Sequence, residues 1–281
     1  MFTIFTIPKP FTDPHIRIIQ RNAIQSWKKL EPECEILLLG DDEGIATTAK
    51  KYDISHIPEM ACNKYGTPLL DSAFSLARKH ARYDVLVFIN TDIITLPDFT
   101  SVVHYLPESN YLVAGQRFDL DIREKIDYNT TDWGKKILAK TRNIKRHPPN
   151  GSDYFLFKRA LFDDIPEFAV GRVGWDNWML HNAQKNKIMT IDATRVITII
   201  HQNHDYSHHL FKKMDRTNDP ETLENLRIGR KAGFLYLDET DFYFNQQGVL
   251  RQRFFIQKAK IRRGIKRFFF KSAFVRKRWT F

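Results

Sequence analysis

The segment Asn90-Thr91-Asp92 places an amide and a carboxylate two residues apart, directly after the apolar run 84–89. A carboxylate at the end of a buried strand can bind a divalent cation, which takes oxygen ligands and bridges the oxygens of a diphosphate. The same pattern is also typical of a turn closed by Asn or Asp side chains, so a structural role stays open. We predict a metal ligand at Asp92 and expect its side chain to face solvent.

An acidic residue, Asp176, stands at the start of a predicted helix between two large aromatic residues, Trp175 and Trp178. Such a carboxylate could act as a general base that takes a proton from a reacting hydroxyl. The two indole rings could form an apolar wall that contacts sugar rings and excludes water. The alternative is that Asp176 only complements the positive end of the helix.

Four histidines lie within residues 201–209, directly after the apolar run 195–200. An imidazole at this position could complete the metal site that Asp92 begins, because borderline ions such as Mn²⁺ accept mixed oxygen and nitrogen ligands. His201 is the first choice since it comes immediately at the strand end, and His204 is the second.

These side chains need a scaffold in which strand ends meet, and the hydrophobic pattern predicts one. Short apolar runs predict strands, and apolar residues at three- and four-residue steps predict helices. The predicted strands cover residues 3–7, 35–39, 84–89, 111–114, 154–157 and 195–200. The predicted helices cover about 14–30, 43–51, 70–81 and 175–184. Strands that alternate with helices indicate an α/β domain with a largely parallel sheet, where ligands bind at the carboxyl ends of the strands.

Two parts of the chain are less regular. Residues 119–150 are polar, and we expect a mobile excursion there with a short helix. From residue 205 onward the pattern predicts helices and loops that lead to a C-terminal tail.

The composition excludes several classes of protein. With 281 residues, 42% hydrophobic and 27% charged, the chain is not collagen-like, disordered or a coiled coil. The two cysteines, Cys34 and Cys62, cannot form a disulfide framework or a zinc ligand set alone, and they suit a reducing cytosol. Residues 1–7 are not typical of a signal peptide, and no run of about 18 apolar residues predicts a membrane-spanning helix. We therefore expect a cytoplasmic location.

The formal charge of +11 is concentrated in the C-terminal tail. Residues 251–281 hold twelve Lys and Arg and no Asp or Glu, whereas the rest of the chain is close to neutral. Phenylalanines recur among these charges at roughly helical spacing, which predicts an amphipathic basic helix that binds an anionic membrane surface. The alternatives are a helix that packs on the body and a tail that binds nucleic acid. We expect no nucleic-acid partner, because a neutral body offers no basic groove.

Taken in this order, the segments resemble the GT-A superfamily of nucleotide-sugar glycosyltransferases over roughly residues 1–210. The resemblance implies an α/β, Rossmann-like, mostly parallel sheet flanked by helices as the catalytic domain, and it leaves 211–281 as a helical C-terminal extension. Asn90-Thr91-Asp92 stands where the family has Asp-x-Asp, which binds ribose and metal. Asn90 departs from the family pattern, because an amide can still form hydrogen bonds to ribose but brings no charge to the metal.

The same resemblance implies binding residues on both sides of the reacting bond. Those expected to hold the nucleobase, ribose and diphosphate are Ile7, Pro8, Lys9, Asp41, Asp42, Lys64, Asp71, Asn90, Thr91 and Asp92. Those expected to bind the acceptor are Ser152, Asp153, Trp175 and Trp178. Alternatives stay open for some of them, since Asp41 and Asp42 could cap the next helix and Ser152 and Asp153 could form a plain turn.

The implied activity is transfer of a sugar from a nucleotide-diphosphate donor, with UDP as the expected nucleotide, to a hydroxyl of a glycan or a lipid-linked acceptor. A Mn²⁺ or Mg²⁺ ion held by Asp92, His201 and His204 would assist, and Asp176 would take the proton in a single displacement that inverts the anomeric centre. If Asp176 is not the base, Asp153 is next. A lipid-linked acceptor would place the enzyme at the inner face of a membrane, in polysaccharide assembly.

Two other classes of function stay open. A nucleotidyltransferase acting on sugar phosphates could share the α/β start, but it normally needs a glycine-rich basic loop, and the early loop Pro8-Lys9-Pro10 has no glycine. A non-catalytic adaptor for membranes or nucleic acids would use only the tail.

Overall fold

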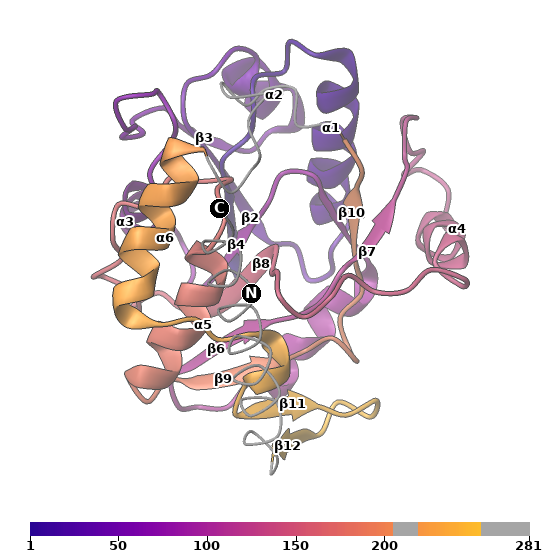
Figure 1. Ribbon diagram of the computed structural model, residues 1–281. Coiled ribbons are helices and arrows are strands. Elements are labelled where there is room, and N and C mark those ends of the chain that lie inside the picture. The colour runs from indigo at the N-terminus through magenta and orange to yellow at the C-terminus, as the bar shows by residue number, and fades with distance from the viewer. Residues whose placement is uncertain (205–218, 254–281) are drawn as a thin grey trace, which may run out of the picture.

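The computed structural model describes residues 1–204 and 219–253, with Lys231 and Ala232 described by their backbone alone (Figure 1). A nine-stranded sheet runs through the molecule in the order β12-β11-β9-β6-β8-β4-β1-β2-β3. Its strands are β1 (Thr3–Thr6), β2 (Glu35–Leu39), β3 (Ser55–Ile57), β4 (Val85–Ile89), β6 (Tyr111–Ala114), β8 (Tyr154–Lys158), β9 (Met189–Asp192), β11 (Phe242–Phe244) and β12 (Leu250–Gln252).

Most neighbouring strands of this sheet run parallel. The pairs β1–β2, β1–β4, β2–β3, β6–β9 and β9–β11 are parallel, whereas β8 is antiparallel to both β4 and β6, and β12 is antiparallel to β11. The predicted mixed α/β architecture with a mostly parallel sheet is confirmed.

Helices cover both faces of the sheet, because its central strands are apolar on both sides. Ile4 of β1 packs in one core with α1 (Pro14–Lys28), α2 (Ile45–Tyr52) and the 3-10 segment η1 (Pro97–Tyr105). The next residue, Phe5, packs in the opposite core with α3 (Leu70–His80) and α5 (Trp175–Lys185). Helix α6 (Pro220–Ala232) lies beside α5 (Figure 1). The predicted strands alternate with helices as expected, and their side chains point alternately to the two cores.

A second, three-stranded sheet corrects the expectation for residues 119–150. Strand β10 (Ile199–Gln202) lies between β5 (Ile93–Thr95) and β7 (Phe118–Leu120). The predicted short helix is present as α4 (Trp133–Lys140). Strand β7 was not predicted, and its side chains form a small separate core with α4, in which Trp133 and Tyr128 contact each other. The final predicted strand also begins later than expected, at Ile199.

Residues after 219 contribute strands as well as helices, so the expectation of a purely helical extension is wrong for residues 242–252. Strands β11 and β12 form a hairpin whose turn is closed by Asn245 and by Gly248, which has a positive φ of 75°. The apolar residues of β11 extend the main sheet beyond β9. The short 3-10 segment η2 (Leu237–Glu239) precedes this hairpin. The division at residue 210 remains a prediction.

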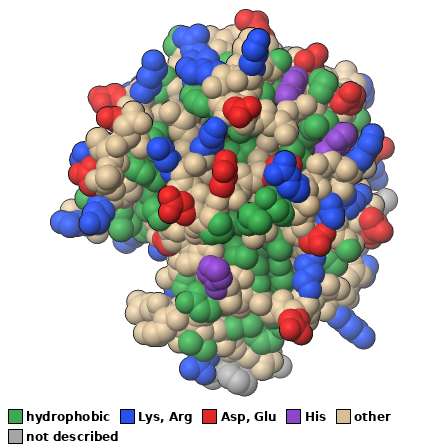
Figure 2. Space-filling view, turned by 180° about the vertical axis from the view of Figure 1, so that it is seen from behind, with side chains coloured by type: hydrophobic (Ala, Val, Ile, Leu, Met, Phe, Trp, Pro, Cys, Tyr) green, Lys and Arg blue, Asp and Glu red, His purple; other side chains and the backbone are tan. Residues whose placement is uncertain are grey.

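The described surface carries charges of both signs. On the face seen in Figure 2, acidic and basic side chains are interspersed and hydrophobic side chains lie between them. Within the described ranges, no helix is long and apolar enough to cross a membrane. The membrane prediction depends on the basic segment 251–281, of which residues 254–281 lie outside the described residues.

Candidate functional site

The carboxyl ends of β1 and β4 lie side by side at the point where the strand order reverses. From β1 the chain goes to β2 and β3 on one side, and it then returns to β4 on the other. The Thr6 hydroxyl at the end of β1 donates to the Ile89 carbonyl oxygen at 2.6 Å and shares a hydrogen bond with the Thr91 hydroxyl at 2.7 Å. In open α/β sheets such a reversal creates a crevice in which ligands bind.

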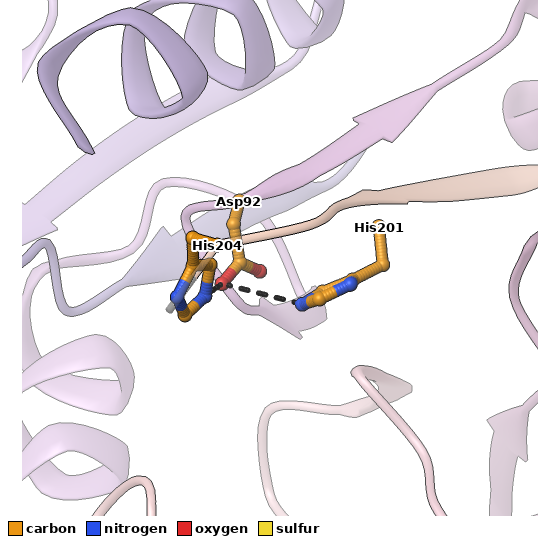
Figure 3. Close-up of side chains that lie close together, drawn as sticks. All are labelled: Asp92, His201 and His204. Carbon is orange, nitrogen blue, oxygen red and sulfur yellow. Dashed lines mark hydrogen bonds and ion pairs between the residues drawn. The ribbon is translucent and has the colours of Figure 1, made fainter. Parts of the chain in front are cut away.

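Asp92 and two histidines meet beside these strand ends, and Figure 3 shows the imidazoles on opposite sides of the carboxylate. His204 Nε2 lies 3.0 Å from Asp92 Oδ2, and His201 Nε2 lies 3.8 Å from the same oxygen. Strand pairing accounts for the approach, because β5 begins directly after Asp92 and places Ile93 opposite His201 of β10. The predicted grouping of Asp92, His201 and His204 is therefore present in the structure.

These three residues fit a divalent cation that accepts mixed oxygen and nitrogen ligands. One ligand atom from each can be chosen so that all lie within 4.8 Å of one another. Asp92 Oδ1 is buried and has no hydrogen-bond partner, as expected for an atom that awaits a ligand. His201 Nδ1 lies 3.2 Å from Asp119 Oδ1, and a carboxylate on the far ring nitrogen is the usual partner of a metal-binding histidine.

The Asp92 side chain is only 14% exposed, so the expectation that it faces solvent is wrong. Burial alone would raise the pKa of this carboxyl, but His201, His204 and Lys9 outweigh that effect and hold the pKa well below its usual range. Burial opposes protonation of His201, yet Asp92 and Asp119 raise its pKa. Asp92 thus stays ionised although it is mostly buried, and its negative charge would balance part of the charge of a bound cation.

Three residues of this region were missed in the sequence: Arg117, Asp119 and His147. Arg117 Nε lies 2.7 Å from Asp119 Oδ1, and its Nη1 lies 2.5 Å from Asp153 Oδ2. The other oxygen of Asp119 lies 3.0 Å from His147 Nδ1. Burial opposes the charge on Asp119, but His201 and Arg117 lower its pKa well below the usual range. Arg117 directly precedes β7 and Asp119 lies within it, so the spacing of the two residues would have placed them on one side of the chain only if β7 had been recognised.

Asp153 belongs to the same network and is held by two partners. Its Oδ1 accepts a hydrogen bond from Asn90 Nδ2 at 3.0 Å, and its Oδ2 accepts one from Arg117 Nη1. This arrangement suggests why residue 90 is an amide, since an aspartate here would face the Asp153 carboxylate. The paired state of Asp153 disfavours it as the alternative base.

Asp176 lies in the first turn of α5, after Gly174, whose φ of 108° starts the helix without a side-chain cap. Its Oδ2 accepts a hydrogen bond from the Ser152 amide at 3.1 Å, and this contact joins Asp176 to the network through the neighbouring Asp153. Burial raises the pKa of Asp176 to about 6, backbone hydrogen bonds from Asn177 and Ser152 oppose the shift, and Asp153 adds to it. A carboxyl group with this pKa changes protonation close to neutral pH, as a general base requires. The Ser152 hydroxyl beside it is buried without a partner.

The interpretation of Trp175 and Trp178 as a sugar-binding wall is wrong. Their exposed fractions are 5% and 4%, and both belong to the core between α5 and the sheet. The Trp175 ring contacts Phe88 at a centroid distance of 5.3 Å, and the Trp178 ring contacts Phe168 at 5.2 Å. Helix α5 turns its apolar face toward the sheet, so these aromatic rings are covered by other aromatic rings.

The residues predicted to bind the donor are partly assembled. Ile7 and Pro8 follow β1 directly, and Lys9 Nζ lies 3.2 Å from His204 Nε2. This loop therefore borders the three residues Asp92, His201 and His204, which are called the Asp92 group below. Asp41 and Asp42 are exposed after β2, next to β1 in the sheet.

Neither Asp41 nor Asp42 is explained by helix capping. Helix α2 begins after Gly44 and has no side-chain cap, so the capping alternative is wrong. Although Asp42 is exposed, nearby protein atoms displace part of the water around its carboxyl group and raise its pKa, and the neighbouring charge of Asp41 raises it further.

The last two predicted donor residues differ in their surroundings. Asp71 lies in the first turn of α3, and its Oδ1 is buried with no hydrogen-bond partner. Lys64 is exposed and lies 5.0 Å from the centre of the Tyr65 ring. Within the described part of the chain, Lys64 makes no hydrogen bond or ion pair with the Asp92 group, so the structure leaves it apart from this site.

Comparisons with known proteins give distant structural likenesses. No family model and no curated protein matches the chain. A candidate nucleotide-diphospho-sugar transferase from Desulfovibrio desulfuricans G20 is 10% identical with a TM-score of 0.42, over 82% of this chain and 97% of that one. Glucosyl-3-phosphoglycerate synthase from Mycobacterium tuberculosis, solved with Mg²⁺ and uridine-diphosphate, is 14% identical with a TM-score of 0.47, over 83% and 80%. The 4-diphosphocytidyl-2C-methyl-D-erythritol synthase from Anaerococcus prevotii is 11% identical with a TM-score of 0.42, over 81% and 96%. At such low identities and TM-scores, the function of this chain has to be inferred from the chemistry of its own site.

Proposed function

We propose that the protein is a metal-assisted glycosyltransferase that moves a sugar from a nucleotide-diphosphate donor, in the first place a UDP-sugar, to a hydroxyl group. The observation that carries the proposal is the Asp92, His201 and His204 group at the strand-order reversal. A second acidic group, Asp176, is linked to it through Ser152, Asp153 and Asn90. Sugar transfer needs this pair of sites, one for the leaving diphosphate and one for the attacking hydroxyl.

On the donor side, the three ligand residues would hold Mn²⁺ or Mg²⁺. When bound, the cation supplies positive charge that stabilises the diphosphate as it leaves. Lys9, at 3.2 Å from His204, adds a second cationic group on the same side. Asp41 and Asp42 lie at the adjacent strand end, where a carboxylate could accept a hydrogen bond from the imide N–H of uracil. Asp71, with an unpaired buried oxygen, suits a ribose or sugar hydroxyl.

On the acceptor side, Asp176 takes the proton of the attacking hydroxyl, because its raised pKa makes it a stronger base than an ordinary aspartate. The unpaired Ser152 hydroxyl offers a hydrogen bond to the acceptor. Asp153 is fully engaged with Arg117 and Asn90, so it positions this region. A single base and a single displacement would invert the configuration of the anomeric carbon.

The acceptor that we propose is a hydroxyl of a glycan or of a lipid-linked sugar, in polysaccharide assembly. This part of the proposal depends on the basic and aromatic composition of residues 251–281, which suits attachment to the inner face of an anionic membrane.

Calorimetry of UDP binding with and without Mn²⁺ or Mg²⁺ tests the donor side. We expect UDP to bind more tightly with the cation, and we expect Asp92→Asn to lose that difference. Asp164→Asn, the same change at an exposed position, serves as the matched control. Transfer is then followed as UDP release from UDP-sugars. If the protein instead consumes a nucleoside triphosphate with a sugar phosphate and releases pyrophosphate, it is a nucleotidyltransferase and the proposal is wrong.

A further inference from the structure

One ring nitrogen of His147 contacts Asp119 and Arg117, and the other ring nitrogen points away from both. Nδ1 lies 3.0 Å from Asp119 Oδ2, and Arg117 Nη2 lies 3.4 Å from the same nitrogen. The backbone of His147 is held as well, since its N–H donates to the Arg117 carbonyl oxygen at 2.8 Å. Among the described residues, Nε2 has no hydrogen-bond partner, and the side chain is 31% exposed. The imidazole is thus fixed at one nitrogen and available at the other.

The available nitrogen of His147 borders the same small space as Asp176. A methyl group added at Gly151 would lie 3.6 Å from His147 Nε2 and 3.9 Å from Asp176 Oδ2. Gly151 does not have a positive φ, so its backbone does not require glycine. The missing side chain instead leaves room between an imidazole and a carboxylate.

Asp119 connects this space to the metal-binding group. One of its oxygens lies 3.2 Å from His201 Nδ1 and the other lies 3.0 Å from His147 Nδ1. A carboxylate can only accept a hydrogen bond and a guanidinium can only donate one, so Asp119 and Arg117 favour opposite tautomers of His147. We assign the proton of the neutral ring to Nδ1 because the Asp119 contact, at 3.0 Å, is shorter than the Arg117 contact at 3.4 Å, and this leaves Nε2 as a hydrogen-bond acceptor. An acceptor at Nε2 suits a hydroxyl group of a ligand.

We infer that His147 binds the acceptor substrate, with Nε2 accepting a hydrogen bond from the hydroxyl next to the one that Asp176 deprotonates. The inference rests on the proposed function and narrows its substrate class to acceptors that carry two adjacent hydroxyls. A pyranose with a vicinal pair offers such hydroxyls, one for each side chain. Arg117 and Asp119 act as positioning residues, because they orient His147 without reaching this space.

Two substitutions of His147 separate binding of the acceptor from a structural role. The amide of His147→Asn can replace Nδ1 at Asp119 but ends short of the Nε2 position. The amide of His147→Gln can reach the Nε2 position but loses the fixed contact with Asp119. Acceptor binding by Nε2 predicts that Asn is the more damaging change, whereas a purely structural role of Nδ1 predicts that Gln is.

Gly151→Ala offers an independent test, since its methyl group would occupy the proposed space at ordinary contact distances. The matched control is Gly134→Ala on α4, where the added methyl group would lie 3.5 Å from Pro97 Cδ. Gly151→Ala should weaken acceptor binding while leaving UDP binding intact. Gly134→Ala should change neither.

Binding of methyl α-hexopyranosides to the full chain is measured by saturation-transfer NMR in the presence of UDP and Mg²⁺. Sugar transfer to the glycoside that binds is then measured as UDP release from a UDP-sugar. We expect the acceptor KM to rise up to about tenfold in His147→Asn and less in His147→Gln, with UDP affinity unchanged within twofold. A deoxy analogue that lacks the adjacent hydroxyl should bind the wild type and His147→Asn equally. The inference is overturned if Gln is the more damaging change, if Gly151→Ala binds glycosides normally, or if the wild type binds UDP but no glycoside. Loss of UDP binding by the wild type would instead overturn the proposed function.

Discussion

The rate of transfer should depend on pH through Asp176, whose pKa is raised to about 6 by burial. The base must be ionised, so activity is lost as the pH falls through this value. At pH 5 about one molecule in ten carries the carboxylate, and at pH 7 about nine in ten do. The rate should therefore rise about tenfold between pH 5 and pH 7 and then level off. Asp176→Asn keeps the shape but cannot take a proton, and we expect the rate to fall by about 10²–10⁴.

The same substitution makes a clear prediction for stability. Because the pKa of Asp176 is higher in the folded protein than its ordinary value, ionisation of this group opposes folding, and the loss of stability develops as the pH rises. Asp176→Asn removes that loss, so its melting temperature at pH 8 should equal or exceed that of the wild type. A fall in rate then cannot be attributed to unfolding.

The assay is UDP release at saturating donor from pH 4.5 to 8.5 at constant ionic strength, with UDP binding measured by calorimetry at the same pH values. Asp164→Asn is the control for removal of one exposed carboxylate. The reasoning is refuted if the wild-type profile is flat while UDP binding is constant, or if Asp176→Asn transfers at the wild-type rate. Loss of UDP binding in Asp176→Asn would move this residue to the donor side.

Three other perturbations test separate parts of the interpretation. Asp92→Asn should lower transfer by about 10²–10³ and abolish the effect of Mn²⁺ on UDP affinity, and normal calorimetry with this variant would contradict the assigned ligand. Trp178→Ala should cost about 3–5 kcal/mol in urea unfolding with little change in rate per folded molecule, because the ring is core; unchanged stability with lost acceptor binding would support the sugar wall after all. Removal of residues 254–281 should keep UDP binding and abolish salt-sensitive sedimentation with anionic vesicles, to which each Lys or Arg contributes about 1 kcal/mol; sedimentation that persists would contradict membrane binding by the tail.

Local pattern in the sequence was sufficient to find the residues that end strands or begin helices. Asp92 follows an apolar run and Asp176 precedes an amphipathic one, so their place in an element could be predicted without knowing the neighbours of that element. The expectation that His201 comes after the end of its strand is wrong, because His201 lies within β10. The mostly parallel sheet followed from the same runs, because strands buried on both faces are nearly continuous in apolar residues.

Side-chain environments could not be predicted in this way, since they depend on pairing between distant segments. Strand β7 pairs with β10 across more than eighty residues of sequence, and this pairing places Asp119 opposite His201. Arg117 directly precedes β7, and His147 joins it through a backbone hydrogen bond to the Arg117 carbonyl oxygen. Trp175 and Trp178 lie next to Asp176 in the sequence, yet the direction in which α5 packs buries them in the core. The raised pKa of Asp176 has the same origin, because it reflects how deeply the folded chain surrounds one carboxyl group, and burial is a property of the packed molecule.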